Sequence, residues 1–434
     1  MKTMIENKIH LFKLTAVIAL LSLASCGGGG SSSASNSTGT FVNSPTKGIK
    51  YSASPSGLSG TTDADGTFSY RSGDTVTFSL DLGAQTLTLG STSSPAAATS
   101  ILSLSVPNGG DPVAVAQVLE TLDKSSVDGK MDVSGIALTA GAALTAISSA
   151  LSSTSVSAAT IAAIATAVQA ALPAGVALKY GTVGVSQNDA LANLAKNPVN
   201  QSLVETKIKD LPNDGSTMLS VQDKPAFTSW VIKKNGQTSY QSLFGHILST
   251  GLTFSFKAPY DVSNDWISTG TYTLSNGNKD GSYTDSEQKV GSFVMKSSDT
   301  NSFVIRYTNS TNAETGSISG TYLLPVSLND IKSKTYTLYG TCNGSDSTVT
   351  INASGVSTDS CSGSTANGAT WANGPFTNTL QYTETNGKRH YLGITRLNKN
   401  GQVGNLPSTS TGTLIEITSD NFNSQARQSA FKVN

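Results

Sequence analysis

The segment SFVIRYT, residues 302–308, indicates the architecture of the C-terminal half of this 434-residue chain. Phe303, Ile305 and Tyr307 occupy alternate positions, and a period of two is typical of a strand that buries one face. Runs of the same kind recur at short intervals, in KTYTLYG (334–340), STVTINAS (347–354) and TGTLIEITS (411–419). We therefore expect this half of the chain to consist of strands.

Turn signals separate these runs. Asn-Gly is the strongest short signal for a hairpin, because both residues of a type I′ turn need a positive φ. Seven such pairs follow residue 214, and they begin at Asn235, Asn276, Asn343, Asn367, Asn373, Asn386 and Asn400. So long a series of hairpins predicts that residues 213–434 form an antiparallel β-barrel or sandwich.

One part of this region resembles a known family. The segment KTYTLYGTCNGSDSTVTINASGVST, residues 334–358, resembles lipocalin-like lipoprotein barrels, in which strands rise around a cavity. The resemblance implies an interior that can hold a small hydrophobic ligand. Aromatic candidates for lining it are Tyr272, Phe293, Phe303 and Tyr336, but the sequence does not show whether they point inward together. The ligand-binding residues stay unknown at this stage.

The N-terminus has the composition of a secretory signal peptide, residues 1–25. Lys2, Lys8 and Lys13 make its start basic, and LTAVIALLSL (14–23) is a short apolar run. That run is too short to cross the ~30 Å hydrocarbon core of a bilayer comfortably as a finished helix. A basic start, a short apolar middle and small residues at the end are typical of export signals.

The end of this signal is more specific. Leu23, Ala24, Ser25 and Cys26 resemble the lipobox of bacterial lipoproteins, and a glycine follows them. The resemblance implies cleavage before Cys26, lipid attachment to its sulfur and transfer to the outer membrane, with the body facing the periplasm or the cell surface. Several acyl chains on one residue give stable anchoring. Residues 26–40 are rich in Gly and Ser and are expected to form a flexible tether.

Residues 41–105 are expected to form a β-module, because Val76, Phe78 and Leu80 alternate with polar residues. The segment GTTDADGTF, residues 60–68, resembles the turn signature of carboxypeptidase-regulatory-like and related Ig-like sandwich modules, which implies a spacer rather than an activity. Asp63 and Asp65 belong to this turn. We interpret them as turn residues and not as calcium ligands, because the full loop of alternating oxygen ligands is missing.

Residues 106–212 are predicted to form a helical segment. Asp111 and Pro112 are a typical helix start, and residues 133–178 contain no charged or aromatic side chain. Two Ala-rich helices are expected there, packed beside the β-module; a membrane span over 159–178 and a short coiled-coil stalk are less favoured alternatives. Three carboxylates near the first helix have the chemistry to bind a cation but are interpreted as solvated: Asp123, Asp128 and Asp132.

After lipidation of Cys26, two cysteines remain, Cys342 and Cys361. An exported chain matures under oxidising conditions, so we expect them to form a disulfide. Closing this loop stabilises a fold by roughly 3 kcal/mol in the chain-entropy picture.

Several classes of chemistry have little support in the sequence. Basic and acidic residues balance at 28 each, so no strong field points to nucleic acid. Beyond the signal only His246 and His390 remain, which makes a zinc site or a Ser-His-Asp triad improbable. We expect no metal, no cofactor and no catalytic residues. His246 is interpreted as a packed histidine, and Lys388, Arg389 and His390 as an exposed hairpin end.

The three tryptophans are the largest side chains whose roles remain to be predicted. Trp230, Trp266 and Trp371 are interpreted as core or rim anchors rather than ligand platforms. The chain as a whole is predicted to be mainly β and multidomain: an N-terminal β-sandwich module, an Ala-rich helical middle and a C-terminal antiparallel barrel or sandwich.

The leading functional hypothesis is a non-enzymatic, lipid-anchored cell-envelope protein with a binding or structural, adhesin-like role. Its expected partners are the membrane, through the lipid, and a glycan, a protein or a small apolar ligand. One alternative is a lipocalin-like carrier of a small hydrophobic ligand. A second is a glycan-processing enzyme, which needs only two suitably placed carboxylates.

Overall fold

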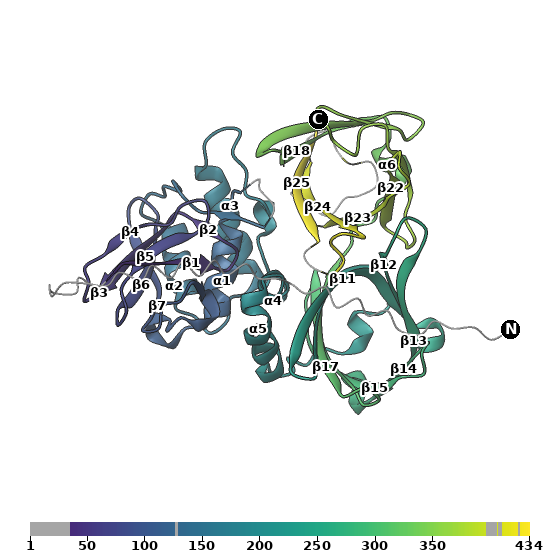
Figure 1. Cartoon of the computed structure of the whole chain (residues 1–434), viewed down its shortest axis with the longest axis horizontal. Coiled ribbons are helices and arrows are strands. Elements are labelled where there is room, and N and C mark those ends of the chain that lie inside the picture. The colour runs from purple at the N-terminus through teal and green to yellow at the C-terminus, as the bar shows by residue number, and fades with distance from the viewer. Residues whose placement is uncertain (1–34, 126–128, 396–405, 407–409, 424–425) are drawn as a thin grey trace, which may run out of the picture. The chain divides into compact units, whose positions relative to one another are not determined.

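The computed structural model describes residues 35–125, 129–395, 406, 410–423 and 426–434. The predicted fold class is confirmed: sheets come first along the chain, helices occupy the middle and antiparallel β structure makes up the C-terminal half (Figure 1). The signal peptide, the lipobox with Cys26 and the tether up to residue 34 lie outside the described residues.

Two sheets make up the N-terminal β-module. One consists of β5 (Thr67–Tyr70), β1 (Ser37–Val42) and β8 (Ala98–Ser100), and the other of β4 (Ser59–Thr61), β3 (Ile49–Ser54), β6 (Thr75–Asp81) and β7 (Thr86–Thr92). The rings of Phe41 and Phe68 lie 4.6 Å and 5.1 Å from that of Phe78. The two sheets therefore share one apolar core. The folded body starts at Ser37, inside the predicted tether, because β1 pairs with both β5 and β8.

The helical middle contains the predicted elements. Its helices are α1 (Pro112–Thr121), α2 (Ala142–Leu151), α3 (Ala158–Ala171), α4 (Gln187–Ala195) and α5 (Pro198–Asp210), and two short strands, β2 (Thr46–Lys47) and β9 (Met131–Asp132), pair in parallel. The Asp111 side chain caps α1 by accepting the Val113 N–H at 2.8 Å. Within the described residues, none of the helices has both the length and the apolar character that a membrane span needs.

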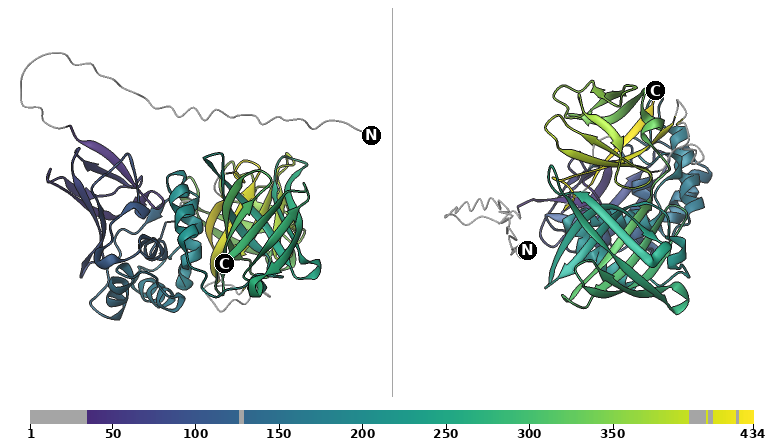
Figure 2. Two further views of the ribbon diagram at one scale, coloured as in Figure 1. Left: turned by 90° about the horizontal axis from the view of Figure 1, so that it is seen from below. Right: turned by 90° about the vertical axis from the view of Figure 1, so that its right-hand side faces the viewer.

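Eight antiparallel strands then close into a barrel. They are β10 (Ala226–Lys234), β11 (Gln237–Leu248), β12 (Thr253–Pro259), β13 (Asp265–Ser275), β14 (Asp280–Asp285), β15 (Val290–Ser298), β16 (Ser302–Asn309) and β17 (Glu314–Tyr322). Each strand pairs with the next, and β10 also pairs with β17, which closes the ring. Figure 2 shows the tilted strands of this half of the chain from the side. Asn235 and Gly236 make the first hairpin with φ values of 51° and 77°, as the Asn-Gly signal predicts.

A second sheet of eight strands follows the short helix α6 (Leu328–Ile331). Its order is β20 (Ser357–Asp359), β19 (Ser345–Ile351), β18 (Lys334–Cys342), β25 (Arg427–Val433), β24 (Thr411–Thr418), β23 (Arg389–Thr395), β22 (Thr379–Thr383) and β21 (Thr370–Asn373). The edge strands meet: Ser357 N–H donates to the Ala369 carbonyl at 3.0 Å, and Trp371 N–H to that of Gly355 at 2.7 Å. We call this structure the curled sheet.

Residues 213–434, predicted to form an antiparallel barrel or sandwich, therefore hold two β structures, of which the first is a closed barrel. The closed barrel spans residues 226–322 and the curled sheet residues 334–433. One buried apolar cluster lies within the curled sheet. Another includes the barrel residues Phe244 and Phe293 and extends to Tyr391, Ile415 and Ile417 of the curled sheet. Short 3-10 helices connect the elements of the chain: η1 (Ile101–Ser103), η2 (Pro107–Gly109), η3 (Gly181–Val183), η4 (Met218–Ser220), η5 (Thr250–Leu252) and η6 (Asn276–Asn278).

Candidate functional site

The closed barrel contains a cavity of about 230 Å³. Side chains from all eight strands and from η4 line it, at alternate positions along each strand, as a pleated barrel wall requires. The lining residues are Met218, Trp230, Ile232, Gln241, Ile247, Phe254, Phe256, Trp266, Ser268, Tyr272, Tyr283, Asp285, Lys289, Phe293, Ile305, Tyr307, Asn309, Asn312, Glu314 and Ile318.

Aromatic rings form much of the cavity wall. The Trp230 ring centroid lies 5.2 Å from that of Phe256 and 5.7 Å from that of Tyr307. The Trp230 indole N–H donates to Thr228 Oγ1 at 2.9 Å, which fixes the ring orientation. Pairs of rings at such spacings are favourable beyond the area they bury. The wall is therefore both apolar and well ordered.

Glycines on neighbouring strands make room for these rings. A Cβ added at Gly291 would lie 2.5 Å from the Tyr283 ring, and one added at Gly316 would lie 2.8 Å from the Tyr307 ring. Real Cβ atoms do not approach carbon this closely, so glycine is required at both positions. A glycine in a strand often marks the close approach of another group. Here that group is an aromatic ring lying across the strand.

The cavity also contains a cluster of polar residues. The Tyr307 hydroxyl donates to Glu314 Oε1 at 3.1 Å, and Asn312 Nδ2 donates to Glu314 Oε2 at 3.3 Å. Burial, followed by the Glu314 charge, raises the pKa of Tyr307 well above its usual value. Burial, then the charges of Glu314 and Asp285, likewise raises the pKa of Tyr283. Both phenols therefore stay protonated at neutral pH.

Two amide oxygens in the cavity wall are unsatisfied. Gln241 Oε1 and Asn312 Oδ1 are buried and have no hydrogen-bond partner within the described part of the chain. Buried polar atoms in folded proteins are nearly always paired, so each such atom calls for an explanation. A bound molecule that donates hydrogen bonds would satisfy them.

The predicted aromatic candidates divide between two places. Tyr272 and Phe293 line the barrel cavity, whereas Tyr336 lines a cavity in the curled sheet. Phe303 is buried but lines neither, because its ring lies against Gly320 of the adjacent strand β17. The sequence analysis named Trp230 as a core or rim anchor and Tyr307 as a strand residue, but assigned neither of them to a cavity, and it did not name Glu314. Alternation along β10, β16 and β17 is the signal that could have grouped them.

The tryptophans occupy cavity walls. Trp230 and Trp266 line the barrel cavity, and Trp371 lines that of the curled sheet. Their interpretation as core or rim anchors is therefore incomplete. The predicted disulfide is present, with Cys342 and Cys361 Cα atoms 5.4 Å apart.

The interpretation of His390 as part of an exposed hairpin end was wrong. Only 5% of His390 is exposed. The turn ends at Lys388, and strand β23 then directs every second side chain inward, beginning with His390. Its Nδ1 lies 2.6 Å from Glu416 Oε1 and its Nε2 2.6 Å from Glu384 Oε1. His246 packs against the Phe376 ring at 5.0 Å, as predicted.

The predicted roles of the N-terminal carboxylates had mixed outcomes. Asp63 Oδ1 accepts the N–H groups of Asp65 and Thr67, both at 2.9 Å, which confirms the turn. The prediction that Asp123 is solvated was wrong, since it is buried with Lys179 Nζ 3.8 Å away. Asp132 is partly buried and bonded by Lys47 and Lys124. Asp128 lies outside the described residues.

Comparisons with known proteins give little further information. No family model matches the chain, and no curated protein matches it. A solved structure that resembles it is a protein of unknown function from the DUF3598 family of Nostoc punctiforme, at 10% identity and a TM-score of 0.16, covering 50% of this chain and 96% of that one. A likeness this distant carries no functional argument.

Proposed function

We propose that the closed barrel of residues 226–322 binds a small, ring-containing molecule that is neutral or cationic. In this view the chain is a binding protein and not an enzyme. The observation that carries the proposal is the aromatic cavity of about 230 Å³ inside the barrel, which is partly open to solvent. An internal cavity lined by apolar side chains with a few polar groups is the usual form of a small-molecule site.

The size of the cavity limits the ligand. An engineered apolar cavity of about 150 Å³ takes up benzene, so a volume of about 230 Å³ suits a molecule of one to two rings. A long acyl chain would not fit wholly within this volume. The unsatisfied oxygens of Gln241 and Asn312 favour a ligand with at least one hydrogen-bond donor.

Charge limits the ligand further. Asp285 and Glu314 line the cavity as carboxylates, and Lys289 is the lining cation. Lys289 also pairs with Glu287, which reduces its availability to a ligand. An anionic ligand would therefore meet net repulsion in a setting where charges are poorly screened. Neutral and cationic ligands would not meet this repulsion.

The glycan-processing alternative has weaker support. A glycosidase needs a carboxylic acid with a raised pKa as its proton donor. In the curled sheet, hydrogen bonds from His390 and Tyr382 to Glu416 outweigh its burial and lower its pKa. In the barrel, Glu314 already accepts bonds from Tyr307 and Asn312. These contacts suit fixed carboxylates better than a proton donor.

The proposed location follows from the sequence. The lipobox resemblance supports a lipid on Cys26 and a place in the cell envelope, where the barrel would act as a tethered, lipocalin-like carrier or sensor. An adhesin-like role remains the structural alternative. No contact in the described residues favours it specifically.

Fluorescence of the full chain can test the proposal. In a Trp371→Phe background, Trp230 and Trp266 are the remaining tryptophans, and both line the barrel cavity. We expect 2-naphthol, a neutral two-ring donor, to change their emission saturably. Ser268→Phe fills the cavity and should weaken this binding by about tenfold or more, which corresponds to ~1.4 kcal/mol.

The matched control is Thr269→Phe. Thr269 neighbours Ser268 on β13, and its side chain points to the other face of the strand. This variant should bind 2-naphthol as the background does. Equal loss in both variants, or no saturable binding in a folded background protein, would contradict the proposal. Circular dichroism establishes folding in each case.

A further inference from the structure

The curled sheet encloses a cavity of its own, of about 290 Å³. Its apolar wall consists of Ile331, Tyr336, Leu338, Val349, Ile351, Trp371, Leu380, Leu392, Ile394, Leu414 and Phe431. Most of these side chains are almost fully buried, for example Ile351 and Leu392 at 2% and 1% exposure. The apolar wall of the cavity therefore lies in the interior of the curled sheet, and another part of the cavity opens to solvent.

An unsatisfied donor lies in this wall. The Trp371 indole N–H is buried and has no hydrogen-bond partner among the described residues. The Trp371 ring lies 5.1 Å from that of Tyr382, which holds it in place. A buried tryptophan N–H usually finds an acceptor. A molecule in the cavity that carries an acceptor would supply it.

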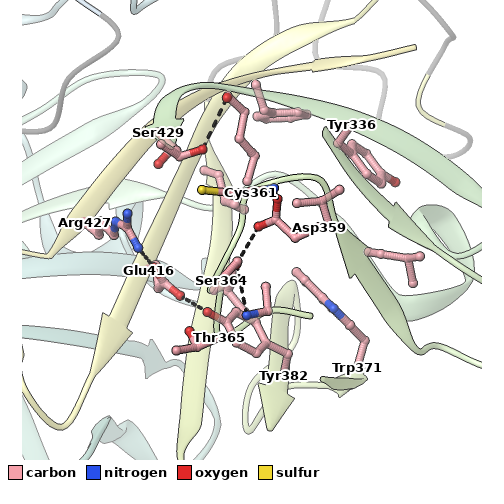
Figure 3. A pocket seen from close by; sticks show the side chains of 18 of the residues that line it. Tyr336, Asp359, Cys361, Ser364, Thr365, Trp371, Tyr382, Glu416, Arg427 and Ser429 are labelled. Atoms are coloured by element: carbon pink, nitrogen blue, oxygen red, sulfur yellow. Dashed lines mark hydrogen bonds and ion pairs between the residues drawn. The ribbon is translucent and has the colours of Figure 1, made fainter. Parts of the chain in front are cut away.

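The opposite side of the cavity is polar. Figure 3 shows Glu416, Arg427 and Ser429 together on one side, with Tyr336 and Trp371 on the other. Glu416 Oε1 accepts hydrogen bonds from Tyr382 and from His390, both at 2.6 Å. Its Oε2 lies 3.7 Å from Arg427 NH1, beyond hydrogen-bond length. The two charged groups therefore form an ion pair at this side of the cavity.

The charges on the cavity wall favour certain ligands. Glu416 and Asp359 are the lining carboxylates, and Arg427 is the lining cation. The two carboxylates outnumber the single cation, so the charge of the wall disfavours an anionic ligand. Because an apolar cavity of about 150 Å³ takes up benzene, about 290 Å³ suits a two-ring molecule.

One wall of the cavity is a loop held by the disulfide. Residues 361–366 line the space, and Cys361 is bonded to Cys342 of β18. The same loop is tied to Asp359, which accepts the Cys361 N–H at 2.9 Å and the Ser364 hydroxyl at 2.6 Å. The covalent link and these two hydrogen bonds together fix the position of the wall.

We propose that the curled sheet of residues 334–433 is a second small-molecule site, independent of the barrel. Its ligand is a neutral or cationic two-ring molecule that accepts a hydrogen bond from the Trp371 indole N–H. The Cys342–Cys361 disulfide holds the loop that encloses it. The proposal does not depend on what the barrel binds.

The test uses tryptophan as a local reporter. The double variant Trp230→Phe/Trp266→Phe leaves Trp371 as the remaining tryptophan. Quinoline and naphthalene have nearly the same shape, but only quinoline has a ring nitrogen that accepts a hydrogen bond. We expect saturable quenching by quinoline, with an affinity about tenfold higher than that of naphthalene. The anion 2-naphthoate should bind more weakly than either.

Two further variants separate the parts of the proposal. Trp371→Phe in a Ser268→Phe background, measured by equilibrium dialysis, should bind quinoline and naphthalene equally. Cys342→Ser/Cys361→Ser, in the single-reporter protein, should lose at least about fivefold in quinoline affinity while its circular dichroism is retained.

Each result has a definite reading. No saturable quenching by quinoline in the folded reporter protein would overturn the second site. Equal affinities for quinoline and naphthalene would overturn the role of the indole N–H, and an unchanged affinity in the cysteine variant would overturn the role of the disulfide. If the reporter protein does not fold, ¹⁹F NMR of the wild-type chain labelled with 5-fluorotryptophan gives the same three readings, with the Trp371 signal assigned from Trp371→Phe.

Discussion

The Tyr307 hydroxyl donates to Glu314 Oε1 over 3.1 Å inside the barrel, where burial keeps the phenol protonated. The pair places a carboxylate in the polar part of the cavity, where Lys289, itself paired with Glu287, is the lining cation. For the ligand proposed above, this carboxylate would disfavour an anion. It also makes the charge preference open to a direct test.

Glu314→Gln should weaken the binding of cationic ligands. The amide keeps the size of the side chain and an oxygen for the Tyr307 hydroxyl. In the Trp371→Phe background, the affinity for (2-naphthylmethyl)ammonium should fall by about tenfold, because a charge-assisted contact is worth ~1.5–3 kcal/mol. The affinity for neutral 2-naphthol should change by less than about twofold. A parallel fall for both probes would show that the variant damages the cavity and not its charge.

Gly320→Ala should destabilise the barrel. A Cβ at this position would lie within 3 Å of several atoms of the Phe303 ring. Overpacking of this kind costs about 1–3 kcal/mol, measured as a change in the free energy of unfolding in urea. Phe303→Leu removes the ring, so the double variant should be more stable than the sum of the two single changes predicts. Simple additivity would mean that the ring and the glycine do not interact.

Asp123 should make stability depend on pH. Burial is the largest cause that raises its pKa, to about 6, against 3.8 for an exposed aspartate. The folded state therefore holds this proton more tightly than the unfolded state, so its contribution is fully present below pH 3.8 and is lost as the pH rises through about 6. Between pH 4.5 and 7 the loss amounts to roughly 2 kcal/mol.

Asp123→Asn is the matching variant. Its amide oxygen can still accept the N–H groups of Ser125 and Asp132, as the carboxylate does at 2.7 Å and 2.9 Å. Lys179 loses its partner, so the variant is less stable overall. Its unfolding free energy should nevertheless fall less than that of the wild type between these two pH values. The same slope in both proteins would rule out this role for Asp123.

Cys26→Ser should move the protein from the membrane fraction to the soluble fraction. The serine hydroxyl cannot take the lipid that the lipobox resemblance implies, and without acyl chains no stable anchor remains. Immunoblots of fractionated cells give the measurement, with Ser25→Ala as a control that keeps a small residue before the cysteine. Retention of Cys26→Ser in the membrane fraction would argue against the lipobox interpretation.

The sequence predicted local structure better than it predicted the site. The Asp111 cap of α1 and the Asn235-Gly236 hairpin depend on neighbouring residues, so short motifs were enough. Alternation identified Phe303, Ile305 and Tyr307 as strand residues of one face. It could not distinguish a sandwich from a barrel, because closure depends on the pairing of β10 with β17, some 90 residues apart.

The two cavities could not be predicted from the sequence for a related reason. Tyr272 and Tyr336 are both inward-facing aromatics, yet they belong to different β structures. The burial of His390 depends on Glu384 and Glu416, which approach it only when β22, β23 and β24 pair. The pairing of strands therefore decides which polar residues become buried. A single sequence does not show which strand pairs with which.

Closure of the β structure affects how the protein behaves at high local concentration. An unpaired edge strand can form backbone hydrogen bonds with a strand of a neighbouring molecule, and such pairing is a common first step of aggregation. The barrel has no edge, because β10 pairs with β17, and in the curled sheet Ser357 and Trp371 join the two ends through backbone hydrogen bonds. Chains tethered densely on a surface would therefore collide at this half of the molecule without polymerising through it.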